Sequence, residues 1–341
     1  MKAAHLLAPG NMITVDVPEI SAGENEVAIR VAYCGVCGTD MHLWHGKMAE
    51  RLSLPQAIGH EMSGTIEQVG IKVTGLSVGD RVTVRPLAYS TPVGDWTEDA
   101  AHIRPGSKFL GIDTPGAMQA RWVVPAETVH RLPQNLPLDI GALVEPLSVA
   151  CHDVHLAGLR AGETAVVIGG GTIGILIALV AQLKGARVVV FEVNKTRLAA
   201  LRALGLEAFD PSETDASNVV MEMTQQRGAD VVFEVSGSQP GIGLTTELAR
   251  VRGRIVIVGI APGMVPINMF HIFWKELQIL GARVYNAGDF ERAIEIASSG
   301  QLPLQKLISG KIPIEDAANA FKSIERGDDV IKLLIDCGAD R

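Results

Sequence analysis

The stretch Thr164–Glu192, TAVVIGGGTIGILIALVAQLKGARVVVFE, decides the fold of the middle of this chain. It opens with a β-branched run, Thr164–Ile168, that has the length and composition of a buried strand, and Gly169, Gly171 and Gly174 follow as G-x-G-x-x-G. The first glycine permits a tight turn, the second lets the backbone approach a pyrophosphate, and the third lets helix and strand pack closely. An apolar helical run and a second buried-strand run complete a βαβ unit. The pattern predicts a dinucleotide site, with a glycine-rich turn of some other doubly wound sheet as the alternative.

The second strand ends on Glu192, which follows the last fingerprint glycine at the spacing expected of a ribose-binding acid. A carboxylate there accepts hydrogen bonds from an adenosine ribose and repels a 2′-phosphate, so NAD is predicted over NADP. Arg197 lies close enough to complicate this choice. The free N–H groups of the helix N-terminus favour the phosphates, and Ile173 is placed to approach them through its backbone.

Composition limits the class of protein. A chain of 341 residues, nearly half of them apolar, is long enough for two domains. Its formal net charge of −8 argues against nucleic acid and anionic membranes as partners. It has no apolar run of membrane-spanning length and no secretory signal at the N-terminus, and its four cysteines do not form a disulfide pattern. We therefore predict a cytoplasmic protein.

The pattern of expected secondary structure changes near residue 146. Before it, short strands are broken by glycine and proline turns, which predicts an irregular antiparallel barrel; after it, strands and helices alternate, which predicts a Rossmann sheet. We expect residues 1–146 and 285–341 to form one domain and residues 147–284 the other. The expected strands are Val27–Tyr33, Met62–Val69, Arg81–Val84, Gln119–Val124, Asp230–Val235, Arg254–Val258, Gln278–Ala282 and Asp329–Ile335. The expected helices are Ser148–Ala157, Lys195–Ala203, Ala216–Gln226, Gly243–Ala249, Phe290–Ser298 and Ile314–Glu325.

A second informative stretch is CGVCGTDMH, which begins at Cys34. Taken alone, the pair Cys34 and Cys37 is a redox pair, half of a zinc knuckle or two buried thiols, and the absence of a second C-x-x-C excludes a tetrathiolate zinc. His60 and Glu61 follow in GHE, and Glu145 precedes Pro146 where the two domains should meet. One thiolate, one imidazole and one or two carboxylates suit a zinc site with an open position.

The motifs GVCGTDMH, GHEMSGTI, VGDRV, EPLSVACH, GGGTIG and FEVNKTRL occur in the order found in zinc-dependent medium-chain dehydrogenases. The chain resembles that family, the alcohol dehydrogenase superfamily, over essentially its whole length, and within it the sorbitol, threonine and butanediol dehydrogenase branch. The resemblance implies an α/β fold class: a doubly wound parallel Rossmann sheet plus a GroES-like irregular β-barrel catalytic domain.

The resemblance also implies roles for the residues of the metal motifs. Cys37 and His60 occupy the thiolate and imidazole ligand positions of a catalytic zinc. Glu61 is the neighbouring carboxylate, either a ligand or an exchange partner, and Glu145 is a further carboxylate near the metal. Cys34 matches a buried strand cysteine without a ligand role.

A proton route is implied by the same motif. Thr39 would take the proton from the substrate oxygen, and His42 would release it to solvent after it passes the nicotinamide ribose. Each has a plainer alternative, a turn hydroxyl for Thr39 and a solvated surface histidine for His42. Asp40 stands where a carboxylate orients the metal site.

Cofactor contacts are expected at the carboxyl ends of later strands. Val258 and Ile260 end the strand predicted beneath the nicotinamide, so their backbone is expected to bond the carboxamide. By resemblance, Arg197 contacts the adenosine ribose. Arg283 follows the last strand and either touches cofactor or substrate or is an ordinary surface arginine.

The chain departs from much of the family between Arg85 and Gly106, where relatives carry four cysteines for a structural zinc and this sequence has none. We therefore predict one catalytic zinc per subunit and no structural zinc. The family implies a homotetramer or homodimer.

The leading hypothesis is an NAD- and zinc-dependent dehydrogenase that oxidises a secondary alcohol to a ketone, with a polyol, sugar alcohol, sugar or related diol as the expected substrate. A threonine-type amino-alcohol dehydrogenase remains open. The alternatives are a zinc-independent NAD(P)H quinone-type reductase, which normally lacks the Cys–His–Glu set, and a dinucleotide-binding protein without turnover.

Overall fold

A computed structural model describes residues 1–89, 98–261 and 263–338 and divides the chain into two compact units. Unit 1 comprises Met1–Glu145 with Ala293–Arg341, and unit 2 comprises Pro146–Arg292. The chain passes from one unit to the other inside helix α3 (Val144–Leu156) and returns inside helix α9 (Ala287–Ser299). The sequence predicts that the chain returns to the first domain after residue 284, shortly before α9 begins.

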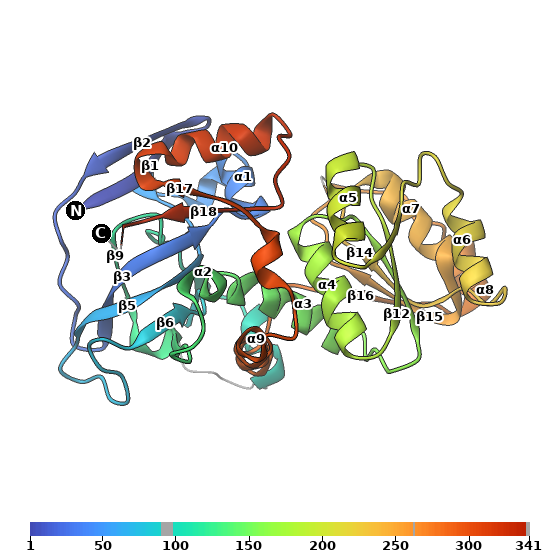
Figure 1. The fold of residues 1–341 in the computed structure, drawn as a ribbon, viewed down its shortest axis with the longest axis horizontal. Coiled ribbons are helices and arrows are strands. Elements are labelled where there is room, and N and C mark those ends of the chain that lie inside the picture. Colours follow the sequence, from blue (N-terminus) through green and yellow to red (C-terminus); the bar gives the residue numbers. More distant parts are fainter. Residues whose placement is uncertain (90–97, 262, 339–341) are drawn as a thin grey trace. The chain divides into compact units, whose positions relative to one another are not determined.

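Unit 1 is built mainly of strands (Figure 1). Its strands are β1 (Lys2–Ala8), β2 (Asn11–Asp16), β3 (Glu26–Gly35), β4 (Gln56–Ala57), β5 (Glu61–Val69), β6 (Arg81–Val84), β7 (Leu87–Tyr89), β8 (Ser107–Phe109), β9 (Arg121–Pro125), β10 (Val129–Arg131), β17 (Ile308–Pro313) and β18 (Lys332–Asp336). Its helical segments are α1 (Gly38–Trp44), α2 (Leu138–Gly141), α10 (Ala317–Glu325) and the 3-10 turns η1 (Ala49–Arg51), η2 (Glu98–Ile103), η3 (Ala126–Thr128), η4 (Leu304–Leu307) and η5 (Ile314–Asp316).

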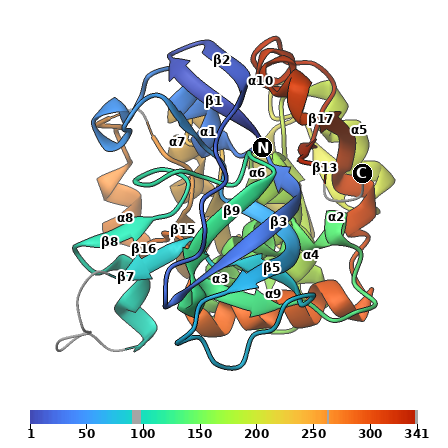
Figure 2. The same ribbon diagram turned by 90° about the vertical axis from the view of Figure 1, so that its left-hand side faces the viewer.

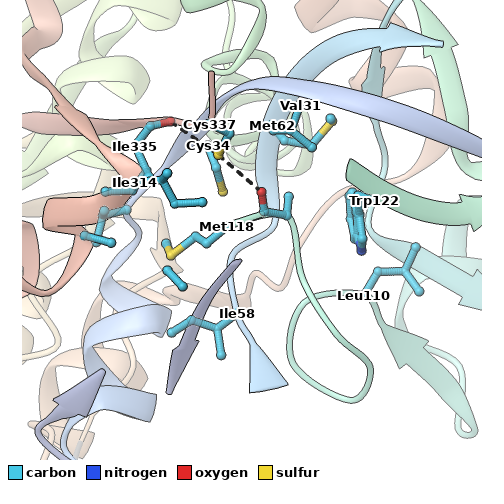
Figure 3. Close-up of a cluster of buried hydrophobic side chains, with 14 of the residues drawn as sticks. Val31, Cys34, Ile58, Met62, Leu110, Met118, Trp122, Ile314, Ile335 and Cys337 are labelled. Atoms are coloured by element: carbon cyan, nitrogen blue, oxygen red, sulfur yellow. Dashed lines mark hydrogen bonds between the residues drawn. The ribbon is translucent and has the colours of Figure 1, made fainter. Parts of the chain in front are cut away.

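The main sheet of unit 1 runs in the order β10-β6-β5-β3-β18-β17, with β9 paired to β3 as well. Figure 2 shows β3, β5 and β9 side by side, as their antiparallel pairing requires. The C-terminal strand β18 enters this sheet next to β3, so the last residues of the chain complete the fold of the first. The interior is apolar and includes Met62, Met118 and Trp122 together with the buried Cys34 and Cys337; Trp122 lies next to Leu110 (Figure 3).

Unit 2 alternates strands with helices. Its strands are β11 (Thr164–Ile168), β12 (Arg187–Phe191), β13 (Glu207–Phe209), β14 (Ala229–Glu234), β15 (Ala249–Ile257) and β16 (Gln278–Gly281). Its helices, besides the parts of α3 and α9, are α4 (Thr172–Leu183), α5 (Lys195–Ala203), α6 (Ala216–Met223), α7 (Gln239–Leu248) and α8 (Met269–Lys275).

The sheet of unit 2 has the order β13-β12-β11-β14-β15-β16, and every recorded pairing in it is parallel. The strand order reverses between β11 and β14, which makes the carboxyl ends of these two strands the switch point where a doubly wound sheet binds its ligand. The barrel and the Rossmann sheet confirm the predicted fold class.

Several boundaries differ from the sequence prediction for local reasons. Helix α3 begins before Pro146 rather than at Ser148, because proline is tolerated in the first turn of a helix, where its missing N–H has no partner to lose. Strand β15 begins at Ala249, well before the predicted start. Its first half contains Arg252 at φ 56° and Gly253, which look like a turn in the sequence, and the pairing with β14 absorbs them as an irregularity of register.

Candidate metal centre and cofactor crevice

Cys37 lies at the turn between strand β3 and helix α1. It is the residue that immediately precedes the helix, and the Asp40 carboxylate accepts its backbone N–H at 2.9 Å. This local hydrogen bond satisfies one of the free N–H groups of the helix start and fixes the direction in which the Cys37 side chain leaves the backbone.

His60 and Glu61 lie at the start of strand β5. The chain approaches them through Gly59 at φ +100°, where an added Cβ would lie 2.7 Å from the Cys34 sulfur, so only glycine fits. Gly35 on the paired strand leaves the space that the Glu61 carboxylate occupies. The His60 ring is packed edge-on by Phe109, with ring centroids 5.2 Å apart and an interplanar angle of 81°.

The fold brings Cys37, His60 and Glu61 together although they come from two segments. One ligand atom of each lies within 4.8 Å of the others, and no other such group of ligand side chains occurs among the described residues. Glu61 Oε1, His60 Nδ1 and Asp40 Oδ1 are buried without a hydrogen-bond partner, although His60 Nδ1 lies 3.5 Å from Asp40 Oδ1. Buried polar atoms without partners are costly, and a cation among them would remove that cost. A thiol, an imidazole and a carboxylate are the donors that zinc prefers, so the residues present fit a zinc ion.

Lys332, the first residue of β18, is a part of this centre that sequence reasoning missed. It is 3% exposed, and its Nζ donates to Glu61 Oε2 at 2.6 Å and to the Val36 carbonyl at 2.9 Å. Burial alone lowers the pKa of Lys332, but the charges of Glu61, Cys37 and Glu145 raise it above its ordinary value. A lysine at the head of the apolar run KLLI was the available clue.

The remaining predicted residues of unit 1 lie near this group rather than in it. Glu145 is 4% exposed and is not among the clustered ligand atoms, but its charge acts on Lys332. Thr39 and His42 are both half-buried on α1. The pKa of His42 is lowered by burial and by the positive charges of Lys47 and His45.

In unit 2 the glycine fingerprint forms the turn between β11 and α4. Gly169 has φ +105°, and Gly171 is the residue before the helix. A Cβ at Gly174 would collide with the Gly169 carbonyl, which explains the third glycine. A Cβ at Gly171 would instead meet only the Arg197 guanidinium, at 4.0 Å, so the turn is open there and Arg197 reaches it. Ile173 lies in the first turn of α4, half-buried, with its backbone at the same opening.

Glu192 directly follows β12 and joins the fingerprint turn to the next loop. It is 6% exposed; one oxygen accepts the Gly170 N–H at 2.7 Å and the other the Asn194 N–H at 2.8 Å. Arg197 Nη1 lies 3.9 Å from the same carboxylate. Glu192 therefore holds both loops in place and presents a negative charge beside Arg197.

Glu234, at the end of β14, is a second buried carboxylate that sequence reasoning missed. Its oxygens accept the backbone N–H of Ser236 and of Gly237, both at 3.1 Å, and the Ser236 hydroxyl. Its carbonyl accepts the N–H groups of Val258 and Gly259, which ties the loop after β15 to the switch point. The acid was readable in the motif FEVSG, but nothing in the sequence showed that it turns inward.

The other predicted cofactor residues follow β15 and β16. Val258 is half-buried, and Ile260 is 66% exposed, with its carbonyl close to Gly237. Arg283 is exposed and comes just after β16. Loops that follow the carboxyl ends of parallel strands lie at one edge of the sheet, and the cofactor contacts of these residues stay a prediction.

Comparisons with known proteins agree with this geometry. A family model described as "Zinc-binding dehydrogenase" matches residues 172–299, and one described as "Alcohol dehydrogenase GroES-like domain" matches residues 23–134. A 2-dehydro-3-deoxy-L-galactonate 5-dehydrogenase of Pseudoalteromonas atlantica is 46% identical over 341 residues, 100% of both chains. D-xylulose reductase A of Aspergillus niger is 31% identical over 93% of this chain and 91% of its own. The structure of 2R,3R-butanediol dehydrogenase from Bacillus subtilis matches with a TM-score of 0.90 and 29% identity, covering 98% of this chain and 99% of that one.

The chain therefore belongs to the zinc-dependent medium-chain dehydrogenases of the alcohol dehydrogenase superfamily, which confirms the resemblance seen in its motifs. It is an oxidoreductase that acts on CH–OH groups with zinc and a nicotinamide cofactor, and it converts a secondary alcohol to a ketone. None of the helices in the described ranges combines the length and the apolar composition needed to cross a membrane.

Proposed function

We propose that the protein is an NAD-dependent dehydrogenase, with one catalytic zinc and no structural zinc, that oxidises a secondary hydroxyl of a polyhydroxylated substrate. Polyols, sugar alcohols and sugar acids are the substrate class, since the similar proteins act on a deoxygalactonate, a xylulose and a butanediol by name. The observation that carries the proposal is the group of the half-buried Cys37 with the buried His60 and Glu61, in which one carboxylate oxygen lacks a hydrogen-bond partner.

Cys37 and His60 would hold the zinc, with Glu61 as a third ligand or an exchange partner. Bound there, zinc supplies Lewis-acid chemistry that makes an alcohol hydroxyl acidic enough to ionise near neutral pH. Lys332 keeps one Glu61 oxygen engaged, so that only the other is available to a cation. Glu145 would accept a hydrogen bond from the neighbouring hydroxyl of a diol, which favours polyols over simple alcohols.

The proton would leave through α1. Thr39 Oγ1 accepts it from the substrate oxygen, and the half-buried His42 imidazole returns it to solvent. The lowered pKa of His42 keeps the ring neutral near physiological pH and hence able to accept a proton.

In unit 2, the Glu192 carboxylate would accept hydrogen bonds from the adenosine ribose hydroxyls and repel a 2′-phosphate, and Arg197 would contact the same ribose. The N-terminal turn of α4, with Ile173, would receive the pyrophosphate. The backbone of Val258 and Ile260 would bond the carboxamide, and Arg283 would lie at the rim of the crevice.

The test is NADH formation with polyols, sugar acids, sugars, amino alcohols and simple diols, measured as purified, after chelation and after zinc is restored. Turnover on a polyol or sugar acid that zinc restores supports the proposal. Preference for a threonine-type amino alcohol would replace polyols with amino alcohols as the substrate class. Turnover that survives complete metal removal would favour the zinc-independent reductase instead, and NAD binding with full zinc occupancy but no turnover on any member would leave a dinucleotide-binding protein.

We also propose that the chain forms a homodimer, or a homotetramer built from such dimers, through one surface of unit 2. This surface combines the outer edge of β16, which ends its sheet among the described residues, with the exposed face of α8. The rings of Phe270 and Trp274 are stacked there with their centroids 5.7 Å apart, and the two residues are 62% and 69% exposed. Lys275 anchors the helix by donating to two carbonyls at the end of α7 and to that of Ala249, the first residue of β15.

An open strand edge beside exposed aromatic rings suits a second copy, because two such edges pair about a two-fold axis. Trp274→Glu should halve the molar mass in sedimentation, from two chains to one or from four chains to two, whereas Ile71→Glu, at a residue 88% exposed in unit 1, should leave it unchanged. A wild-type protein that sediments as one chain would contradict this assignment.

A further inference from the structure

The turn that follows β8 is closed by Asp113. Asp113 Oδ2 accepts the Phe109 N–H at 2.7 Å, and the Phe109 carbonyl accepts the Asp113 N–H at 2.9 Å. The side chain and the backbone of one residue thus both bind Phe109, so the position of Phe109 depends on that of the Asp113 carboxylate.

Arg51 binds the same carboxylate from another part of the chain. Its Nε donates to Asp113 Oδ1 at 2.8 Å and its Nη2 to Asp113 Oδ2 at 2.7 Å, a two-pronged pair whose side chains are only 29% and 22% exposed. Two parallel charge-assisted hydrogen bonds fix orientation as well as distance. The pKa of Asp113 is raised by burial, but the Arg51 and Phe109 donors outweigh this and lower it, so the carboxylate stays charged.

Each residue of this ion pair is connected to a different ligand residue of the candidate metal centre. Arg51 ends η1, the segment that follows α1, and α1 begins directly after Cys37. On the other side, the Phe109 ring stands edge-on to the His60 imidazole at 5.2 Å.

The turn also lies against the backbone that carries His60. Gln56 Nε2 donates to the Ile112 carbonyl at 3.0 Å, and the Ala117 N–H donates to the Gly59 carbonyl at 2.8 Å. A Cβ at Gly111 would press on this same stretch, at 3.3 Å from His60 Cβ. Little space remains for the turn to shift without moving His60.

We propose that the Arg51–Asp113 ion pair is a positioning device for the metal centre: it holds Phe109 against the His60 ring and so fixes the imidazole in the orientation that a metal ligand needs. Neither residue touches substrate or metal. The inference rests on the proposed function only in taking His60 as a ligand, and it concerns metal retention rather than turnover.

The chain offers a matched control in the same unit. Asp80 closes a turn by accepting the Ser77 N–H at 2.9 Å, and Arg131 Nε donates to the same oxygen at 2.8 Å, a single hydrogen bond from a side chain 55% exposed. This pair contacts none of the ligand residues in the recorded hydrogen bonds and ring contacts. Asp80→Asn and Arg131→Lys therefore remove a turn-closing Arg–Asp pair of the same unit without the proposed connection to His60.

The test measures the rate at which the full-length, zinc-loaded protein releases zinc to a chromogenic chelator, and the visible spectrum of the cobalt-substituted protein. Asp113→Asn and Arg51→Lys should speed release about tenfold, the lower end of the effect of removing a group that orients a metal ligand. Both should also alter the cobalt bands. Asp80→Asn and Arg131→Lys should change release by less than about twofold, which lies within the scatter of independent surface changes.

Phe109→Leu tests whether the faster zinc release of the Asp113 and Arg51 variants depends on the contact between the Phe109 and His60 rings. Alone it should speed release as Asp113→Asn does, and the double variant should be no faster than either, because the two residues act in one connection. Independent, multiplying effects, or equal release from the Asp113 and Asp80 variants, would overturn the proposal. A His60→Ala protein that keeps its zinc would instead overturn the proposed function, so the two failures are distinguishable.

Discussion

The two units treat their buried carboxylates in opposite ways. In unit 2, Glu192 and Glu234 each accept backbone N–H groups with both oxygens, so these acids serve to hold loops at the edge of the sheet. In unit 1, Glu61 and Asp40 each keep one buried oxygen without a hydrogen-bond partner. Carboxylates whose oxygens all accept hydrogen bonds shape a crevice before its ligand arrives. A buried carboxylate oxygen without a hydrogen-bond partner, beside a thiol and an imidazole, instead marks the place of a cation.

The two sites also differ in how local they are. The crevice depends on a continuous βαβ stretch and on the loops that follow the later strands of the same sheet. The metal centre needs Lys332, which lies 271 residues from Glu61 in the chain. A local site depends on turn geometry, and a distributed site depends on the whole barrel. Five substitutions test this contrast.

The largest effect is expected at the unsatisfied centre itself. His60→Ala should lower kcat/KM at least about a thousandfold, because Lewis-acid chemistry contributes several kcal/mol and about 1.4 kcal/mol is a factor of ten. His5→Ala, a half-buried histidine of β1, serves as the control. Zinc content and steady-state rates check the result, and a variant that loses zinc but keeps its rate would remove the metal from the chemistry.

The next largest effect is expected at Lys332. Lys332→Met should destabilise the zinc-free protein by about 3 kcal/mol, because removing one partner leaves the other charge buried and unpaired. Added zinc should stabilise this variant more than the wild type, since the cation replaces the lost positive charge beside Glu61. Denaturant unfolding with and without zinc measures both quantities. Lys311→Met, which breaks the more exposed pair with Asp139, should show no such dependence on zinc.

A smaller loss is expected in the satisfied crevice. Glu234→Gln keeps the shape but turns an NH2 group toward the donors of Ser236 or Gly237, which costs about 2 kcal/mol for an unmade buried hydrogen bond. NAD affinity, followed by titration, should therefore fall while zinc release stays as in the wild type. The exposed Glu276→Gln is the control. Equal changes in zinc release would mean that the two sites are not separable in the way described.

Cofactor choice should respond to Glu192 by roughly tenfold. Glu192→Gln removes the charge that repels a 2′-phosphate and leaves Arg197 beside the turn, so the ratio of kcat/KM for NAD over NADP should fall by about that factor. Comparison of the two cofactors at one pH measures it, with the exposed Glu207→Gln as control. An unchanged ratio would mean that residues other than Glu192 determine the preference between NAD and NADP.

The smallest effect concerns pH and the Arg51–Asp113 pair. The folded-state pKa of Asp113 lies below its ordinary value of 3.8, so the stability that the pair contributes is fully present above that ordinary value. It is lost as the pH falls through the lowered folded-state pKa. Asp113→Asn should therefore cost about 1 kcal/mol at neutral pH, and the difference from the wild type should vanish in strong acid. Unfolding curves across this range test it, and a cost that persists unchanged in acid would contradict the charge-based account.

Much of unit 2 was readable from the sequence, and less of unit 1. The βαβ unit around Gly169 and Gly174 was predicted because each glycine has a local steric reason. The barrel strands were placed more roughly, and Lys332 was missed because a single lysine in an apolar strand gives no indication of its partner. The predicted helix Ser148–Ala157 starts later than α3, which begins at Val144 and includes Pro146 in its first turn.

The sequence by itself determined the chemistry available to this protein: a thiol, an imidazole and carboxylates in recognisable motifs, and a dinucleotide turn with its ribose acid. These depend on residue type and short spacing, which the chain carries locally. Only the tertiary structure decided which oxygen of Glu61 is held by Lys332, which stays without a partner, and which residues orient His60. Those answers depend on strand pairing between the two ends of the chain and on the close approach of the 109–118 segment to Gly59, and no local pattern specifies either.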